Sequence, residues 1–384
     1  MASGIANASI VIAPDSFKGS LTALQAARAM QRGVVRAVPS AEVRLYPMAD
    51  GGEGTLDALL HAGGSRHTVQ VRGAGGAAKT ACIGVLQDGA GAIEVAEVVG
   101  MTDNAAMATP VGERTSAGVG DAIRALLDLG CRRIHIALGG SITNDGGAGM
   151  LVALGARLLD CNGQEISAAP ADLCRLAAVD VRAMDARLLD CELLGMSDVD
   201  NPLTGDQGAT RIFGPQKGVL PEQVATLDAG LANLATHAES SFHRAAHTLP
   251  GSGAAGGLGF ALMLLGAVMR SGAEVVSDLL HLDSALASAD WVLTGEGRSD
   301  LQTLRGKAPF AVCQRARQHG VPVSLISGSV EESALPALGK HFAGCFSIMS
   351  RPMTLQVAMT DAERLLEHAA EQVATLWMAG RTAS

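Results

Sequence analysis

The chain has 384 residues, of which 48% are hydrophobic, 17% charged and 3% aromatic. This length predicts about two domains with a substantial buried core, and the composition excludes a disordered, collagen-like or coiled-coil chain. The 29 basic and 38 acidic residues leave a net charge of −9. Such a surface repels phosphate backbones and anionic lipids, so we expect no nucleic-acid or membrane partner.

The seven cysteines are scattered and form no C-x-x-C pair, so neither a disulfide framework nor a zinc site is predicted. The apolar stretch 10–13 follows no basic region and is too short for the core of a signal peptide. The longest apolar run, 260–269, is shorter than the roughly 20 residues that cross a bilayer. We therefore expect a cytoplasmic protein.

Short β-branched segments recur along the chain, and each precedes a polar, glycine-containing loop and a helix-like stretch. This alternation is typical of a parallel α/β sheet. The first predicted strand, 10–13, precedes a helix over 21–38 that begins at Ser20 or Thr22 and ends before Pro39. Later in the chain, the pattern predicts strands at 43–47, 134–138, 193–194, 291–293 and 323–326, a helix near 118–129 and a closing amphipathic helix over 355–378.

The middle of the chain has a different pattern. Residues 68–95 predict strands joined as hairpins, and 251–272 predicts a glycine-rich start to an apolar helix over 256–270. We infer two α/β domains. A parallel-sheet, Rossmann- or flavodoxin-like domain comprises 1–70 and 288–384, and a second α/β domain, 71–287, is inserted into it.

Residues Gly251–Gly256 match the G-x-G-x-x-G pattern of dinucleotide-binding proteins, and Glu274 follows at the distance of a ribose-binding acid. The fingerprint should follow a strand directly, but His247–Pro250 precedes it. Close packing of the helix is therefore the preferred interpretation, and a NAD-dependent dehydrogenase is an alternative. The sequence contains no complete Walker A pattern, kinase catalytic loop or G-x-S-x-G motif.

Acidic side chains and a lysine gather in the glycine-containing loops instead. In phosphoryl transfer, glycine-rich backbone cradles phosphate, lysine neutralises charge and carboxylates hold Mg²⁺. Asp145 and Asp300 are equally well explained as turn or helix caps, and Lys217 as a solvated surface lysine. The loop residues concerned are Asp15, Ser16 and Lys18; Asp50 and Glu53; Asn144 and Asp145; Asp198, Asp200 and Asn201; and Glu296 and Asp300.

Seven segments in register carry a resemblance to a known family. They are IAPDSFKGSLTA (12–23), PMADGGEGT (47–55), GGSITNDGGAGML (139–151), SDVDNPLTG (197–205), FGPQKG (213–218), GSGAAGGLGFAL (251–262) and LTGEGRSDLQTLRGKAP (293–309). Together they resemble the bacterial glycerate kinases that phosphorylate the 2-hydroxyl of D-glycerate, from residue 9 to about 350. This chain departs at Ser299, where the family usually carries a bulky aliphatic residue, and at Gly19, where many members carry a glutamate.

The resemblance implies ATP-dependent conversion of D-glycerate to 2-phosphoglycerate with Mg²⁺, in a cleft between two α/β domains. If the chain is such a kinase, we expect Lys18 to stabilise the transferred phosphoryl group or the substrate carboxylate. We expect Asp50 to accept the hydroxyl proton. The other expected contacts are substrate at Ser16, Asn201 and Lys217, Mg²⁺ at Glu53 and Asp198, and phosphate at the amides of Gly139, Gly140, Ser141, Gly295 and Gly297.

D-glycerate and ATP are thus the expected partners, and a homodimer is compatible with the sequence. Three alternatives stay open: phosphorylation of the 3-hydroxyl, a NAD-dependent dehydrogenase, and a non-catalytic protein that closes on a small anion.

Overall fold

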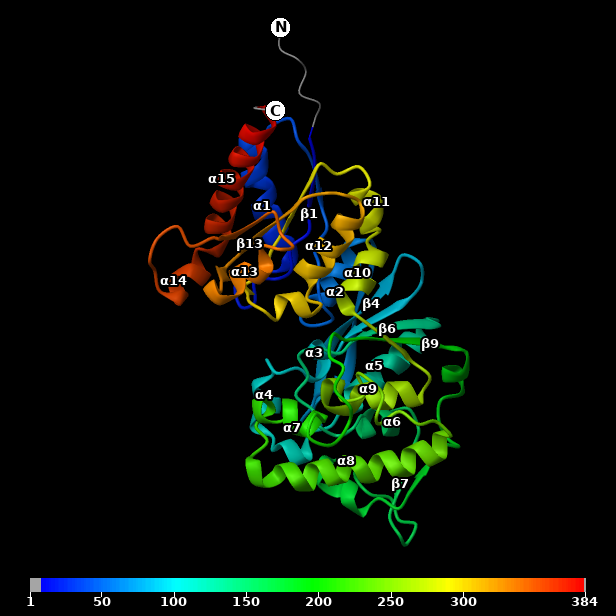
Figure 1. The fold of residues 1–384 in the computed structure, drawn as a ribbon. Helices are drawn as coiled ribbons and strands as arrows, with labels where there is room; N and C mark the ends of the chain where they lie inside the picture. Colours follow the sequence, from blue (N-terminus) through cyan, green and yellow to red (C-terminus); the bar gives the residue numbers. More distant parts are fainter. Residues whose placement is uncertain (1–7, 383–384) are drawn as a thin grey trace. The chain divides into compact units, whose positions relative to one another are not determined.

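The computed structural model describes residues 8–382, which divide into two compact units (Figure 1). Unit 1 comprises the chain up to Asp50, Asp57–His61 and the chain from Gly272 onward; unit 2 comprises Gly51–Leu56 and Ala62–Ser271. These limits differ from the expected boundaries at 70/71 and 287/288. The domain assignment made from the sequence stays a prediction.

Unit 1 contains a sheet of five parallel strands in the order β15-β13-β11-β1-β2. Numbered within the unit, this is the order 2-1-3-4-5, in which the winding direction reverses between β1 and β11. The predicted strands of this unit are confirmed. Their bounds are β1 Ser9–Ile12, β2 Glu42–Leu45, β11 Trp291–Thr294, β13 Val323–Ser327 and β15 Gly344–Ser347, with a small pair β12 Arg298–Ser299 and β14 Ser329–Val330.

Helix α1 (Ala23–Ala37) begins at Thr22, as predicted, with a capping box. The Thr22 side chain accepts the Gln25 N–H, and the Gln25 side chain accepts the Thr22 N–H. Helix α15 (Ala362–Thr382) packs beside α1 (Figure 1) because Gly33 has no side chain: a Cβ there would lie 2.1 Å from the Glu367 carbonyl oxygen.

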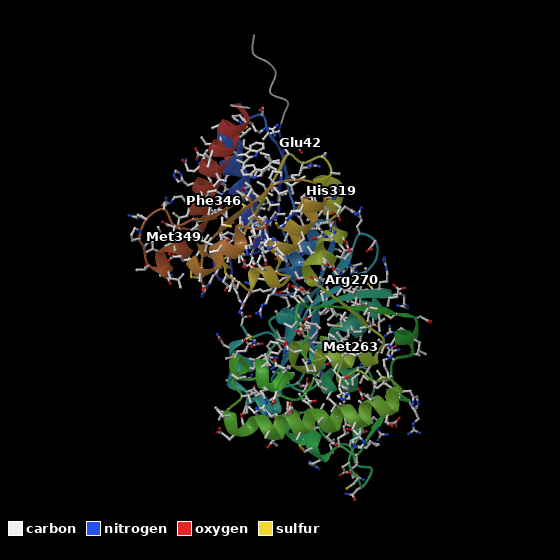
Figure 2. All side chains as sticks on the ribbon, viewed as in Figure 1. Glu42, Met263, Arg270, His319, Phe346 and Met349 are labelled. Carbon is white, nitrogen blue, oxygen red and sulfur yellow. The ribbon has the colours of Figure 1, made fainter. Side chains whose placement is uncertain are left out.

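The prediction of a single closing helix over 355–378 is wrong, because this segment forms two helices. The structure has two helices, α14 (Leu355–Thr360) and α15, because Asp361 between them adopts φ −93°, ψ 5°. The remaining helices of this part of the chain are α2 Thr55–His61, α10 Gly272–Leu279, α11 Leu282–Leu286, α12 Ala308–Gln318 and α13 Leu335–Leu338. Glu42, His319, Phe346 and Met349 mark this unit in Figure 2, and Met263 and Arg270 mark unit 2.

Unit 2 contains a six-stranded sheet in the order β10-β9-β6-β5-β4-β3. The hairpin-joined strands expected at 68–95 are confirmed, since β3/β4 and β4/β5 pair antiparallel, whereas β5, β6, β9 and β10 are parallel. The strands are β3 Gly64–Arg72, β4 Ala78–Leu86, β5 Gly91–Glu94, β6 Arg133–Ala137, β9 Glu192–Met196 and β10 Val268–Arg270, with a small pair β7 Arg157–Leu159 and β8 Ala178–Asp180.

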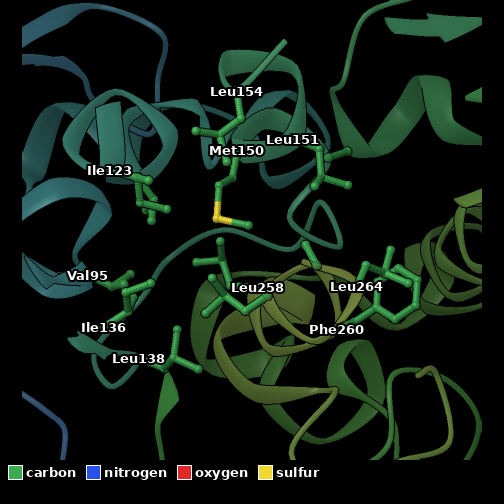
Figure 3. Close-up of a cluster of buried hydrophobic side chains, with 14 of the residues drawn as sticks. Val95, Ile123, Ile136, Leu138, Met150, Leu151, Leu154, Leu258, Phe260 and Leu264 are labelled. Atoms are coloured by element: carbon green, nitrogen blue, oxygen red, sulfur yellow. The ribbon is translucent and has the colours of Figure 1, made fainter. Parts of the chain in front are cut away.

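One face of this sheet is covered by an apolar core (Figure 3). Ile136 from β6, Ile123 from α5 (Ala117–Asp128), Leu151 from α6 (Ala148–Ala153) and Phe260 from α9 (Ala254–Leu264) are all buried in it. The other helices of unit 2 are α3 Val95–Val99, α4 Asn104–Ala108, α7 Ala209–Phe213 and α8 Pro221–Phe242.

The glycine-rich segment Gly251–Gly256 packs closely against another part of the backbone. Gly256 has a φ of 68°, and a Cβ there would lie 2.0 Å from the Thr143 carbonyl oxygen. Residues 243–250, which follow α8, contain no strand. The packing interpretation is therefore confirmed, and the structural context of a dinucleotide fingerprint is missing.

The prediction that this helix continues to residue 270 is wrong. Helix α9 ends at Leu264, Gly266 adopts a φ of 92°, and Val268–Arg270 forms strand β10. None of the helices described within residues 8–382 is long and apolar enough to span a bilayer.

Candidate active site

The loops at the carboxyl ends of the unit 1 strands are held together by backbone hydrogen bonds. The Asp15 N–H donates to the Gly295 carbonyl (2.8 Å), which joins the loops after β1 and β11. The Met48 N–H donates to the Pro14 carbonyl (2.9 Å), which adds the loop after β2. Ligands of open parallel sheets bind at this edge, where the strand order reverses.

These loops bring three acidic side chains together. Asp15 is buried, and one carboxylate oxygen accepts the Ser16 N–H at 2.6 Å. Burial raises the pKa of Asp15 well above its usual value; the charges of Asp50 and Glu296 raise it too, while the Ser16 N–H and Lys307 oppose them. Asp15 and Asp50, from loops 35 residues apart, therefore interact in the folded unit.

Glu296 is buried and satisfied by its own loop. It accepts hydrogen bonds from Ser299 Oγ (3.0 Å) and Thr303 Oγ1 (2.6 Å) and pairs with Lys307 Nζ at 3.1 Å. The Ser299 hydroxyl also lies 2.7 Å from Ser327 Oγ. The departure at Ser299 is therefore accommodated by hydrogen bonds instead of an apolar side chain.

Thr303 and Lys307 were not predicted as site residues. The only signal was the Gly306-Lys307 pair, which resembles part of a Walker motif but is followed by alanine.

Lys18 and Ser16 lie on the loop after β1. Lys18 is exposed, and its ammonium makes no hydrogen bond or ion pair with any residue in the described range 8–382. A Cβ on Gly297 would lie 3.2 Å from the Lys18 amide nitrogen, so these two loops approach closely.

The departure from the family at Gly19 has a structural reason. Gly19 has a φ of 78°, and a Cβ at this position would lie 2.9 Å from Met359 Cε, so a glutamate there would be strained.

Lys217 lies in unit 2, and the surface-lysine interpretation is wrong. Its side chain is buried (2% exposed), and Nζ donates to Ser141 Oγ (3.2 Å) and to the Thr143 carbonyl (2.8 Å). Burial lowers its pKa to about 7; the Asp145 carboxylate opposes this shift, and the Arg114 guanidinium adds to it.

Asp145 is also buried and acts as a cap, as one of its two interpretations predicted. It accepts the Ser116 N–H (2.7 Å) and Oγ–H (2.8 Å) before α5, and the N–H groups of Gly147 (3.1 Å) and Gly149 (3.2 Å) at the start of α6. Burial raises its pKa, and these hydrogen bonds act in the opposite direction.

The loop after β6 was expected to offer three amides to phosphate. The Gly139 amide is not free, because it donates to the Gly51 carbonyl at 2.8 Å, and this corrects the expectation for Gly139. The amides of Gly140 and Ser141 donate no hydrogen bond to another group within residues 8–382. The expected role of the Gly140 and Ser141 amides as phosphate ligands stays a prediction.

Glu53, Asp198 and Asn201 also lie in unit 2. Glu53 and Asp198 are exposed, and the Asn201 side-chain amide donates to the Gln207 carbonyl at 2.8 Å. The loop that carries Glu53 is fixed by a buried acid that sequence reasoning missed: Glu94 accepts the N–H groups of Gly54 (3.1 Å) and Leu56 (3.0 Å).

No group of three or more His, Cys, Asp or Glu side chains within the described range is arranged to hold a metal ion. Magnesium in phosphoryl-transfer enzymes usually has one or two carboxylate ligands, completed by waters and substrate phosphates. The assignment of Glu53 and Asp198 as ligands therefore stays a prediction.

Carboxylates, a lysine and close-packed glycines at the carboxyl edge of a parallel sheet are typical of α/β phosphotransferases. Comparison with known proteins agrees with this class: the glycerate kinase family matches residues 10–378. The chain belongs to the glycerate kinase family, and it is therefore an enzyme, a kinase.

Individual relatives cover nearly the whole chain. A glycerate kinase of Bacillus subtilis (strain 168) is 41% identical over 95% of this chain and 96% of its own length. A glycerate 2-kinase of Escherichia coli (strain K12) is 41% identical over 92% of this chain and 93% of its own.

Among solved structures, the crystal structure of a Salmonella typhimurium LT2 protein assigned as glycerate kinase 2 is 41% identical. It matches with a TM-score of 0.87 over 98% of this chain and 100% of that chain. The family resemblance is thus confirmed, and the dehydrogenase and non-catalytic alternatives are wrong.

Proposed function

We propose that this enzyme transfers the γ-phosphoryl group of ATP to the 2-hydroxyl of D-glycerate, with Mg²⁺, and releases 2-phosphoglycerate and ADP. The observation that carries the proposal is the cluster of Asp15, Asp50, Glu296 and Lys307 at the carboxyl edge of unit 1. The 2-position is supported by the relative named glycerate 2-kinase, at 41% identity.

In the proposed reaction, Asp50 accepts the proton of the attacking hydroxyl, because a carboxylate at the substrate-binding edge can serve as a general base. The Lys18 ammonium, which has no partner within residues 8–382, stabilises the negative charge on the transferred phosphoryl group. Ser16 and Asn201 bind hydroxyl groups of the substrate.

The excess of negative charge at the carboxyl edge of unit 1 supports Mg²⁺ as the ion that accompanies ATP. Asp15, Asp50 and Glu296 place three carboxylates near one lysine, Lys307, and the pKa of Asp15 is raised in part by their mutual repulsion. A divalent cation offsets such an excess of negative charge and neutralises the phosphates of ATP when bound. Glu53 and Asp198 are the proposed ligands, and the amides of Gly295 and Gly297 are proposed to contact phosphate.

We further propose that unit 1 is a flavodoxin-like domain into which unit 2 is inserted. The strand order 2-1-3-4-5 supports this, as does the chain path, because residues 62–271 all belong to unit 2 and both chain ends flanking them belong to unit 1.

The test is a reaction of the purified protein with ATP, Mg²⁺ and D-glycerate, followed by proton-coupled ³¹P NMR of the product. A phosphate on the 2-oxygen couples to one carbon-bound proton and gives a doublet, whereas a phosphate on the 3-oxygen couples to two and gives a triplet. Reactions with L-glycerate, and with a chelator in place of Mg²⁺, are the controls. A triplet, or no ADP formed with D-glycerate, contradicts the proposal.

A further inference from the structure

The buried ammonium of Lys217 lacks an anionic hydrogen-bond partner. Its two acceptors, Ser141 Oγ and the Thr143 carbonyl, are neutral. An ammonium has three N–H donors, and the described residues supply no third acceptor. Burying a charge costs free energy unless an opposite charge pairs with it, so a bound anion next to Lys217 would stabilise this arrangement.

The charges around Lys217 do not cancel. Arg114, 3% exposed, donates to the carbonyls of Lys217 (2.7 Å), Thr109 (2.8 Å), Met107 (3.2 Å) and Ile142 (3.4 Å), and to no carboxylate within residues 8–382. Asp145 is the acid whose charge raises the pKa of Lys217, but its carboxylate accepts hydrogen bonds from Ser116, Gly147 and Gly149 instead. Two buried cations thus face one buried carboxylate.

Neutral donors lie beside this charge. The Ser141 hydroxyl accepts from Lys217, which leaves its own proton available. The amides of Gly140 and Ser141 have no acceptor within residues 8–382, and Gly140 is exposed, which gives solvent access to the loop. Ammonium, hydroxyl and backbone amides are the groups that bind a small oxyanion.

A second observation concerns two buried polar atoms near this charge. Thr143 Oγ1 and Asn144 Oδ1, on the same loop, are buried and have no hydrogen-bond partner among the described residues. Buried polar atoms are nearly always satisfied, so a bound water or ligand hydroxyl is expected next to them.

We propose that Lys217, the Ser141 hydroxyl and the amides of Gly140 and Ser141 form the subsite for the carboxylate of a small hydroxy-acid substrate. Arg114 is a positioning residue, because it holds the Lys217 backbone. The inference rests on the proposed function, which it deepens by naming the substrate group that is recognised. A carboxylate fits better than a nucleotide phosphate chain, because one ammonium balances one negative charge and a triphosphate carries several.

The test measures ligand binding without turnover. Isothermal titration calorimetry at pH 6.5 compares D-glycerate, the neutral methyl ester of D-glycerate and ATP with Mg²⁺, each titrated separately into the wild-type enzyme and the Lys217→Met variant. We expect Lys217→Met to weaken D-glycerate binding by about tenfold to a hundredfold, since a charged hydrogen-bond donor is lost. ATP binding should stay unchanged, and the ester should bind both proteins equally weakly.

Two other results overturn the subsite. Weaker ATP binding with unchanged D-glycerate binding assigns Lys217 to the nucleotide, and unchanged binding of both ligands assigns it to neither. Because the assay measures binding, its result can be separated from that of the activity test. If the enzyme binds D-glycerate through Lys217 but transfers no phosphate, the proposed reaction is refuted and the carboxylate subsite is still supported.

Ser141→Ala provides a second variant that keeps Lys217, and it should weaken D-glycerate binding about threefold to tenfold if the hydroxyl donates to the carboxylate. Lys340→Met, at an exposed lysine, is the matched control and should bind both ligands as the wild type does. Circular dichroism establishes that each variant is folded. If Lys217→Met does not fold, unchanged D-glycerate binding by Ser141→Ala overturns the subsite.

Discussion

Below about pH 7, Lys217 is charged inside unit 2, and its burial lowers the stability of the fold. Its pKa in the folded protein, about 7, lies below the ordinary 10.5. Below pH 7 both states hold the proton and the cost of burial is complete. Between about pH 7 and 10.5 the unfolded state binds more protons, so this cost decreases as the pH rises.

We expect Lys217→Met to raise the melting temperature at pH 6, by an amount equivalent to about 1–3 kcal/mol once the lost hydrogen bonds are counted. The gain should shrink between pH 7 and 10. Thermal denaturation of both proteins at several pH values checks this. A variant that is less stable at pH 6, or a gain that does not depend on pH, contradicts the account.

Asp50 is the proposed proton acceptor, and its replacement separates catalysis from folding. Asp50→Asn keeps the shape of the side chain but removes its basicity, so kcat should fall by roughly 10²- to 10⁴-fold while the fold persists. Turnover is measured across pH, with circular dichroism for folding. Asp190→Asn, at an exposed acid, is the control. Activity that survives across pH would make Asp50 a loop residue only.

Lys18 offers an exposed ammonium at the edge where phosphate is expected. Lys18→Ala should lower kcat/KM by roughly a hundredfold, the usual loss when one charge-stabilising contact is removed from a reaction site. Steady-state kinetics with D-glycerate check this, and Lys340→Ala shows the effect of removing a distant exposed lysine. Nearly unchanged kinetics in a folded variant would remove Lys18 from the mechanism.

At the level of helices and strands, prediction succeeded where the signal was local. Thr22 and Pro39 frame α1, and the β-branched run 10–13 gives β1, because capping chemistry and hydrophobic periodicity can be read directly from neighbouring residues. The break at Asp361 and strand β10 were missed. Strand β10 depends on a contact with a distant segment, the pairing of Val268 with Leu194. The break at Asp361 is a local change of backbone angles to which no helix-stop residue in the sequence points.

The glycine-rich start of α9 gives a test of such a tertiary constraint. Gly256→Ala should destabilise the enzyme by about 2–4 kcal/mol, because the new Cβ would meet the Thr143 carbonyl and φ is positive. Gly163 also has a positive φ, but nothing lies within 4 Å of its Cβ position. Gly163→Ala should therefore cost only about 1 kcal/mol of backbone strain. Urea unfolding compares the two, and equal losses contradict the packing argument.

On the scale of the whole molecule, the sequence motifs identified the family, but burial decides which residues carry charge. Lys217 lies in the family segment 213–218 and Arg114 lies in none of the seven segments, yet both are buried. A sequence cannot report desolvation, because it depends on which segments cover the side chain in three dimensions. For the same reason the acids at 15 and 50 could be proposed as neighbours only through the strand-end rule.

Each unit has its own hydrophobic core, and both tryptophans lie in unit 1, where Trp291 and Trp377 stack with ring centroids 4.8 Å apart. Tryptophan fluorescence therefore reports on unit 1. Ile326→Val and Ile136→Val remove the same methylene group from the two cores and should each cost about 1 kcal/mol. We expect Ile326→Val to lower the urea midpoint seen by fluorescence, and Ile136→Val to leave it unchanged while shifting the far-UV circular dichroism transition. A fluorescence midpoint that moves equally in both variants would mean that the two cores unfold as one cooperative unit.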